Sequence, residues 1–348
     1  MRRNIQATSL SAAIAEFTAH LRAKRRAKNT IDGYVYVLQK ALGVWGDLST
    51  DAIEPGHIDK FFAAGNWAES TQNQYLATLR VFFKWARNAR YMAPDHDPTV
   101  QWESVRVRSK DRFRLSPDQF YPLMDACTHP RDRAVVAIAL FTFLRGSEIA
   151  TLKWRDVDFT NARLHAVHHK TKLEDAKPIS AELREELVRW QNWYRQDQGT
   201  IQPDWFLVPA KGPDFYLQDP VTRKLTRDSR KPAHLKPTTK LGKPYEVVQR
   251  ALKAIGVDTK GEGVHTIRRS GGAARFNELR GSEGSDFAIM ELASILGHSD
   301  VRTTQRYIGW NIAREQRNEA IAGKPMFPSL KRGSRMRLVE GGSGGSEA

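Results

Sequence analysis

Apolar side chains recur at every third or fourth position through residues 9 to about 92, a spacing that places them on one face of a helix. The longest such stripe consists of Tyr75, Leu76, Leu79, Phe82, Phe83 and Trp85. Residues typical of a helix cap or first turn precede the apolar runs, and the expected helix starts are Ser9 or Ser11, Thr30, Pro55 and Ser70. The pattern predicts an all-helical domain over residues 1–92, in which the aromatic stripe forms core rather than a surface for stacking bases.

The periodicity stops after this domain. Residues 93–115 are polar and contain two prolines, so we expect an interdomain linker there. The sequence Ser116-Pro117-Asp118-Gln119 then provides a cap, a first-turn proline and the partner residue of a capping box. It predicts that a second domain begins at this helix and extends over residues 116–328. The polar tail, residues 329–348, is expected to be disordered.

The second domain mixes helical and strand-like segments. The apolar run Arg133–Leu144 predicts a buried helix, and residues 210–245, rich in Pro, Gly, Lys and Arg, predict a long basic loop. Between them lie three strand-like runs, at Val157–Phe159, Leu164–His168 and Ala176–Ile179. Helices, a small sheet and further helices in that order predict an α+β domain, so the whole chain is expected to be mostly α with a small β-sheet.

Charge and composition narrow the class of partner and the compartment. The 348 residues carry a formal net charge of +16, which favours a polyanion such as nucleic acid because each neutralised phosphate releases counterions. The single cysteine, Cys127, excludes an intrachain disulfide. The longest apolar run, Ala134–Leu144, is shorter than the about 20 residues that a membrane helix needs, and no signal-peptide core follows the N-terminus. We therefore expect a cytoplasmic protein without membrane association.

Three segments carry residues suited to phosphoryl transfer. They are Leu144-Arg145-Gly146-Ser147-Glu148-Ile149, then His265-Thr266-Ile267-Arg268-Arg269, then Leu296-Gly297-His298 with Tyr307 nine residues after the histidine. In this order the segments resemble the arginine, His-x-x-Arg and Leu-Gly-His boxes of the tyrosine recombinase, or phage integrase, family. The helical N-terminal domain is similar to the core-binding (SAM-like) domain of that family. Phe143, where the family commonly has glycine, and Gly146, where a larger residue is frequent, depart from its pattern.

The resemblance implies a role for each motif residue. Tyr307 would attack the phosphodiester and form a 3′-phosphotyrosyl ester, releasing a 5′-hydroxyl. Arg145 and Arg268 would hold the non-bridging oxygens, because guanidinium groups stay charged and donate in a planar fork. His265 and His298 would donate hydrogen bonds to the phosphate, and His265 would also be a candidate acceptor of the Tyr307 proton.

The leaving 5′-oxygen needs a proton, which the family takes from a lysine on a β-turn of its small sheet. Here that turn offers Lys170, with Lys172 as the alternative. Glu148, one helical turn after Arg145, would either orient that guanidinium or be a simple surface charge. Arg269 has no motif role beyond adjacency. The cluster His165, His168 and His169 invites a zinc site, but lacks a cysteine or carboxylate pair at ligand spacing, so we expect neither metal nor cofactor.

The resemblance also implies the partners. The expected substrate is double-stranded DNA carrying inverted-repeat core sites, recombined by a homotetramer through a Holliday junction. A helix after Tyr307, over residues 311–322, would dock either on a neighbouring protomer or on its own domain. Two alternatives stay open at this point: a type IB topoisomerase-like enzyme that relaxes DNA, and a non-catalytic DNA-binding protein on the same scaffold.

Overall fold

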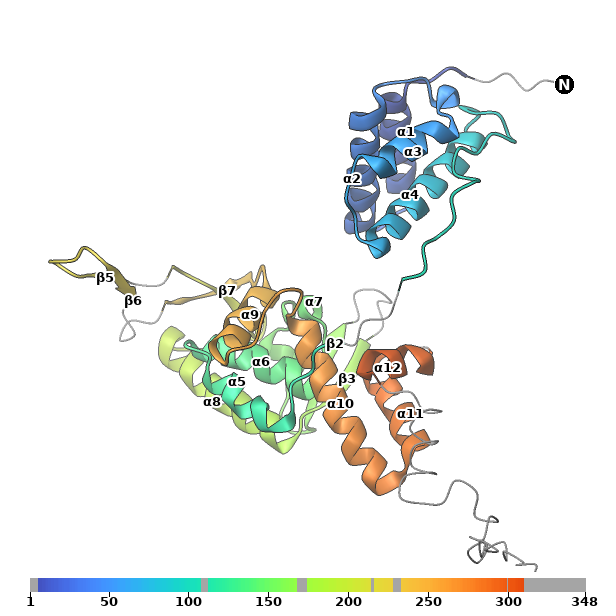
Figure 1. Ribbon diagram of the computed structural model, residues 1–348. Coiled ribbons are helices and arrows are strands. Elements are labelled where there is room, and N and C mark those ends of the chain that lie inside the picture. Colours follow the sequence, from blue (N-terminus) through green and yellow to red (C-terminus); the bar gives the residue numbers. More distant parts are fainter. Residues whose placement is uncertain are drawn as a thin grey trace, which may run out of the picture. The chain divides into compact units, whose positions relative to one another are not determined.

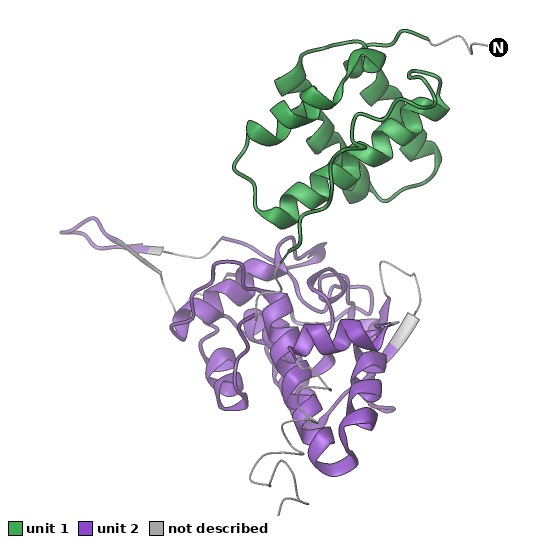
Figure 2. Cartoon of the chain, turned by 45° about the vertical axis from the view of Figure 1, so that its right-hand side comes forward, with its two compact units in different colours: residues 1–110 green, residues 111–348 purple. Residues whose placement is uncertain are grey.

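The chain folds into two compact units, residues 1–110 and 111–348, each with its own apolar core (Figures 1 and 2). The structure is a computed structural model, and the residues that it describes are 6–107, 112–167, 174–213, 216–227, 233–298 and 300–309. Across these ranges, every helix is too short or too polar to cross a membrane.

Unit 1 is helical, as predicted. Its helices are α1 (Leu10–Ala23), α2 (Lys28–Trp45), α3 (Pro55–Ala63) and α4 (Glu69–Asn88), with a 3₁₀ turn, η1, at Thr50–Ala52. The side chain of Ser9 accepts a hydrogen bond from the amide of Ala12, so Ser9 rather than Ser11 caps α1. The expected caps at Thr30 and Ser70 were wrong, because both residues lie inside their helices, where packing of the apolar face sets the first turn.

The aromatic stripe of α4 is core, as its spacing predicted. Phe82 and Phe83 are fully buried, and the ring of Phe82 meets that of Phe17 edge to face with centroids 5.5 Å apart. Burying each such side chain contributes about 1.5–3 kcal/mol. After α4 the chain continues along unit 1, where the side-chain amide of Asn73 exchanges two hydrogen bonds of 2.8 Å with the backbone of Val105.

The buried helix α6 (Pro130–Thr142) lies at the centre of unit 2, among the other helices (Figure 1). Its helices and 3₁₀ turns are η2 (Pro117–Gln119), α5 (Phe120–Asp125), α6 (Pro130–Thr142), α7 (Gly146–Ile149), η3 (Trp154–Asp156), α8 (Ala181–Gln198), α9 (Pro244–Ala254), α10 (Val264–Glu283), α11 (Ser285–Leu296) and α12 (Val301–Ile308). The predicted capping box between Ser116 and Gln119 forms. All residues of α6 from Ala134 to Leu140 are buried, as the continuous apolar run predicted.

The small sheet also follows the prediction, whereas the expected basic loop was wrong. The strands β1 (Val157–Asp158), β2 (Arg163–Val167) and β3 (Glu174–Pro178) pair antiparallel in that order. Within residues 210–245, β4 (Pro209–Lys211) pairs with β7 (Leu235–Lys240), and β5 (Tyr216–Gln218) forms a hairpin with β6 (Leu225–Arg227). Such short strands among Pro and Gly leave no alternating pattern to read.

Helices α6 and α10 cross so closely that one position requires glycine. A Cβ atom on Gly271 of α10 would lie 2.8 Å from the carbonyl oxygen of Leu140 and 2.7 Å from the ring of Phe143. Phe143 ends α6 in the left-handed conformation, with φ of 55°, where glycine is favoured and where this sequence departs from the family pattern. The turn at Phe143 directs the chain into α7, where Gly146 lies beside Val264 in the first turn of α10.

Candidate active site

Arg145 is held by a buried carboxylate. Arg145 directly precedes α7. Its backbone amide donates a hydrogen bond of 2.8 Å to the Glu148 carboxylate, and its guanidinium Nη1 donates one of 3.0 Å to the same carboxylate. The side chain of Glu148 is only 2% exposed, whereas that of Arg145 is 33% exposed. Of the two readings of Glu148, the orienting role therefore agrees with the contacts, because a surface charge would not be buried against this guanidinium.

Arg268 is almost fully buried in the second turn of α10. Its Nη1 donates to the carbonyl oxygen of Phe143, and its Nη2 donates to that of Leu296 over 2.6 Å. The arginine thus joins the end of α6 to the end of α11. Its guanidinium carbon lies 5.9 Å from the centre of the Tyr307 ring.

The end of α11 receives a second cation. The buried Lys177 of β3 donates from Nζ to the carbonyl oxygen of Ile295 over 2.5 Å, next to the Leu296 carbonyl that Arg268 binds. Cations suit the C-terminus of a helix, where carbonyl groups lack intrahelical partners. Gly297 then turns the chain in the left-handed conformation, and His298 follows.

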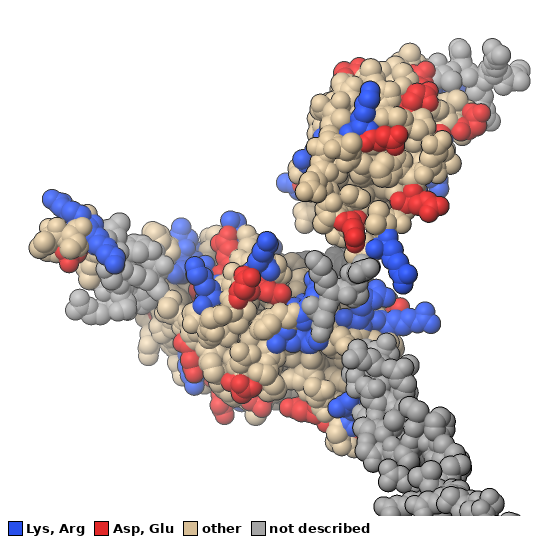
Figure 3. All heavy atoms as spheres, in the orientation of Figure 1, with Lys and Arg blue, Asp and Glu red and all other residues tan. Residues whose placement is uncertain are grey.

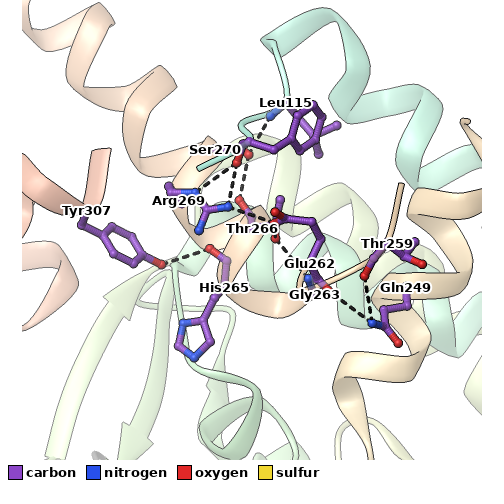
Figure 4. Close-up of polar contacts among 11 residues, drawn as sticks. Leu115, Gln249, Thr259, Glu262, Gly263, His265, Thr266, Arg269, Ser270 and Tyr307 are labelled. Atoms are coloured by element: carbon purple, nitrogen blue, oxygen red, sulfur yellow. Dashed lines mark hydrogen bonds and ion pairs between the residues drawn. The ribbon is translucent and has the colours of Figure 1, made fainter. Parts of the chain in front are cut away.

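His298 and Tyr307 form one contact group. The Nδ1 atom of His298 lies 2.9 Å from the hydroxyl oxygen of the fully buried Thr304, on α12. The imidazole meets the ring of Tyr307 edge to face, with centroids 5.5 Å apart. The Tyr307 hydroxyl donates to the backbone carbonyl oxygen of His265 over 3.2 Å (Figure 4). Three elements, α10, α12 and the turn after α11, therefore meet at the phenol.

Burial, together with the positive charge of the site, shifts the pKa values of its histidines and its tyrosine. Desolvation lowers the pKa of His298 to about 4, and the charges of Arg268 and Arg145 act in the same direction. The pKa of His265 is lowered by the same two kinds of cause. Burial raises the pKa of Tyr307, while Arg268, Arg269 and Arg145 oppose this rise. At neutral pH the imidazoles are therefore uncharged, and the arginines supply the positive charge.

Lys and Arg side chains gather along the edge of unit 2 that carries α7, α9 and the start of α10, whereas Asp and Glu are more frequent along the opposite edge (Figure 3). Arg145 directly precedes α7, and the buried Arg268 lies in the second turn of α10. Such an arrangement suits an anionic polymer whose phosphates enter between fixed cations.

Five of the six predicted site residues come together in unit 2, namely Arg145, His265, Arg268, His298 and Tyr307. Lys170 and Lys172 lie outside the described residues, as do His168, His169 and residues 311–348. Sequence reasoning missed Lys177 and Thr304. Thr304 stands between the two motif residues His298 and Tyr307, which could have identified it, whereas nothing in the sequence distinguishes Lys177 from the many other lysines.

Comparison with known proteins gives matches over both units. Residues 114–313 match the family described as "Phage integrase family", and residues 14–90 match "Phage integrase, N-terminal SAM-like domain". The tyrosine recombinase XerD of Ralstonia nicotianae is 24% identical over 305 residues, which cover 83% of this chain and 86% of the relative.

Two solved structures share the fold. A lambda integrase tetramer bound to a Holliday junction matches with a TM-score of 0.62 and 15% identity, over 87% of this chain and 78% of that one. The XerH site-specific recombinase, in a post-cleavage complex with a palindromic difH substrate, matches with a TM-score of 0.59 and 16% identity, over 92% of this chain and 86% of that one. At these identities the likeness concerns the fold.

Proposed function

Because this chain belongs to the phage integrase family and is a tyrosine site-specific recombinase, we propose that it cleaves and rejoins double-stranded DNA with Tyr307 as the covalent nucleophile. The observation that carries the proposal is the contact group around the Tyr307 phenol, which includes His265, His298 and Arg268. No other tyrosine among the described residues has this combination of motif and contacts.

In the proposed step the phenolic oxygen of Tyr307 attacks phosphorus, and the bond from phosphorus to the 5′-oxygen breaks. Arg145 and Arg268 stabilise the negative charge that develops on the non-bridging oxygens. The ring of His265, kept neutral by its lowered pKa, accepts the phenolic proton. Lys170, or Lys172 in its place, protonates the leaving 5′-oxygen. Rejoining is the reverse reaction with the 5′-hydroxyl of the partner strand.

His298 serves as a hydrogen-bond donor to the phosphate in this scheme. If the Thr304 hydroxyl donates to Nδ1, the single proton of the neutral ring resides on Nε2. The ring can then donate without carrying a charge. Thr304 would therefore select the tautomer as well as the orientation of His298.

At the level of assembly, we propose a homotetramer that recombines two inverted-repeat core sites through a Holliday junction. The support is the shared fold with the lambda integrase tetramer on a Holliday junction and with XerH on a palindromic substrate. The net charge of +16 agrees with a DNA partner. Exchange between two sites would separate this function from simple relaxation of supercoiled DNA.

The test is a suicide substrate, nicked so that cleavage traps the covalent adduct. Tyr307→Phe should bind DNA like the parent yet form no adduct on a denaturing gel, because phenylalanine keeps the ring and lacks the attacking oxygen. Tyr245→Phe, at a 49% exposed tyrosine of the same unit, is the matched control and should form the adduct. An adduct that persists in Tyr307→Phe would show that another residue attacks.

A further inference from the structure

The chain enters unit 2 directly against the active-site helix. The backbone carbonyl oxygen of Phe113 accepts two hydrogen bonds from Arg269, one of 3.1 Å from Nε and one of 2.7 Å from Nη2. Two residues later, the amide of Leu115 donates to the hydroxyl of Ser270 over 2.9 Å (Figure 4). The segment Phe113–Leu115, called here the entry segment, is therefore bound to two successive residues of α10, Arg269 and Ser270.

The arginine that makes this contact is buried and also pairs with a carboxylate. Arg269 is only 3% exposed, and its Nη2 also lies 3.0 Å from Oε2 of Glu262. The same carboxylate oxygen accepts from the hydroxyl of Thr266, which in turn accepts from the amide of Gly263 over 3.0 Å. This chain of contacts secures the first turn of α10 to the entry segment, as Figure 4 shows. An exposed ion pair contributes little, but breaking a buried one leaves an uncompensated charge.

The two faces of α10 have different partners. At about 100° per residue, Arg269 and Ser270 project about 100° and about 160° away from Arg268, although Arg269 is only about 40° from His265. The side of Arg268 faces the Tyr307 ring and the ends of α6 and α11. The side of Arg269 and Ser270 holds the entry segment. A rotation or shift of these turns would move both sets of contacts together.

The entry segment also reaches the helix of the nucleophile. Between its two backbone contacts, Arg114 places its guanidinium beside Gly309, which ends α12 immediately after Tyr307 and Ile308. Glycine is favoured there because φ is 71°, a backbone conformation that L side chains rarely adopt. One short segment therefore touches both α10, which carries His265 and Arg268, and α12, which carries Tyr307.

We propose that Arg269 is a positioning residue for DNA cleavage, which clamps the entry segment to α10 so that α10 and α12 hold Tyr307 at the phosphate. The inference rests on the proposed function of Tyr307 and adds a residue to which the family motif gives no role. Arg269 acts through the helix and the entry segment and does not contact the reacting phosphate. A misplacement of about 1 Å in such a site costs up to about 100-fold in rate.

The test compares four variants of the full chain in single-turnover cleavage at saturating DNA. Arg269→Gln should slow adduct formation on the order of 10–100-fold, with DNA affinity and the final fraction of adduct unchanged. Arg275→Gln is the matched control, an arginine on the same helix whose ion pair with Glu291 does not involve the entry segment. It should cleave at the parental rate.

Two further variants separate the clamp from the charge of Arg269. That charge lowers the pKa of Tyr307, so Arg269→Gln should also move the pH–rate profile to higher pH, and Arg269→Lys should restore the profile but not the full rate. Arg268 and Arg145 also act on the Tyr307 pKa, His298 packs against the Tyr307 ring and His265 contacts the phenol through its backbone carbonyl, and all four are unchanged in these variants. Ser270→Ala cuts the Leu115 contact without changing any charge, and should slow cleavage with no shift of the profile.

The clamp is overturned if Arg269→Lys and Ser270→Ala both cleave at the parental rate, because charge alone would then explain Arg269→Gln. It is also overturned if the lost rate only follows a loss of folded protein, seen as a smaller adduct fraction. Hydrogen exchange gives a reading without DNA: the Leu115 amide should be protected in the parent and in Arg275→Gln, and exchange faster in Arg269→Gln and Ser270→Ala. If the parent forms no adduct while this protection pattern holds, the proposed function fails, and only the contact between the entry segment and α10 stands.

Discussion

Replacing Thr304 by valine removes one hydroxyl from a fully buried side chain and leaves its shape nearly unchanged. The hydroxyl contacts Nδ1 of His298 at 2.9 Å, and the imidazole in turn packs edge to face on Tyr307. We expect Thr304→Val to slow DNA cleavage without abolishing it. The imidazole keeps its place against the ring but loses the group that fixes its orientation and its tautomer.

The size of the effect follows from one hydrogen bond. A neutral intramolecular hydrogen bond contributes about 0.5–1.5 kcal/mol, and if all of it aligns His298 in the transition state, the rate falls about 2–13-fold. Global stability should fall by no more than the same amount, since valine leaves no cavity. His298 is partly exposed, so water can replace the lost partner and moderate the cost.

The assay is the single-turnover formation of the covalent adduct on a nicked substrate at saturating protein. Thr303→Val is the matched control, because Thr303 is the exposed neighbour on the same helix. Thr304→Ser keeps the hydroxyl and should recover most of the rate. Parental cleavage by Thr304→Val, or an equal slowing by Thr303→Val, would refute the idea that this hydroxyl orients His298.

Two further predictions concern stability. Lys177→Met should lower the free energy of unfolding in urea by about 1–3 kcal/mol, because the Ile295 carbonyl loses a charged donor. The control, Lys153→Met at a surface ion pair, should change the free energy of unfolding by less than about 1 kcal/mol. Equal changes in the two variants would contradict the anchoring of α11 by Lys177. The lowered pKa of His298, about 4 against 6.5, means that the unfolded chain binds more protons between these values, so stability should fall as the pH drops from about 6.5 to 4. Unfolding of His298→Gln at pH 7 and pH 5 should show a smaller loss than the parent, and an identical loss would contradict the shift.

Much of the fold followed from periodicity alone. The helical spacing of apolar residues on α4, the continuous apolar run in α6 and the three short strand-like runs of the small sheet each predicted the element that the structure contains. Helix starts were less accurate, since Ala27 and Ala68 stand at the N-caps of α2 and α4 and packing rather than capping set those ends. The strands within residues 210–245 were missed because β4, β5 and β6 have only three residues each, and because the burial of β7 does not alternate along its six residues.

In the active site, the sequence likewise predicted the motif residues but not the contacts that support them. The three motifs pointed to the residues that surround Tyr307, because nine residues and one turn suffice to bring His298 near it. The supporting contacts depend on tertiary structure and could not be read. Lys177 meets α11 across 118 residues of sequence, and Arg269 meets Phe113 across 156. Contacts between residues so far apart in the sequence produce no local pattern from which they could be predicted.

The contact between Lys177 and α11 restricts insertions and deletions in β3. Successive residues of a strand point to opposite faces, so removing or adding one residue between Glu174 and Lys177 would turn the lysine away from α11. The register from Val167–Glu174 to Arg163–Pro178 should therefore tolerate no insertion or deletion. Homologous chains and engineered variants should therefore keep the length of β3 unchanged.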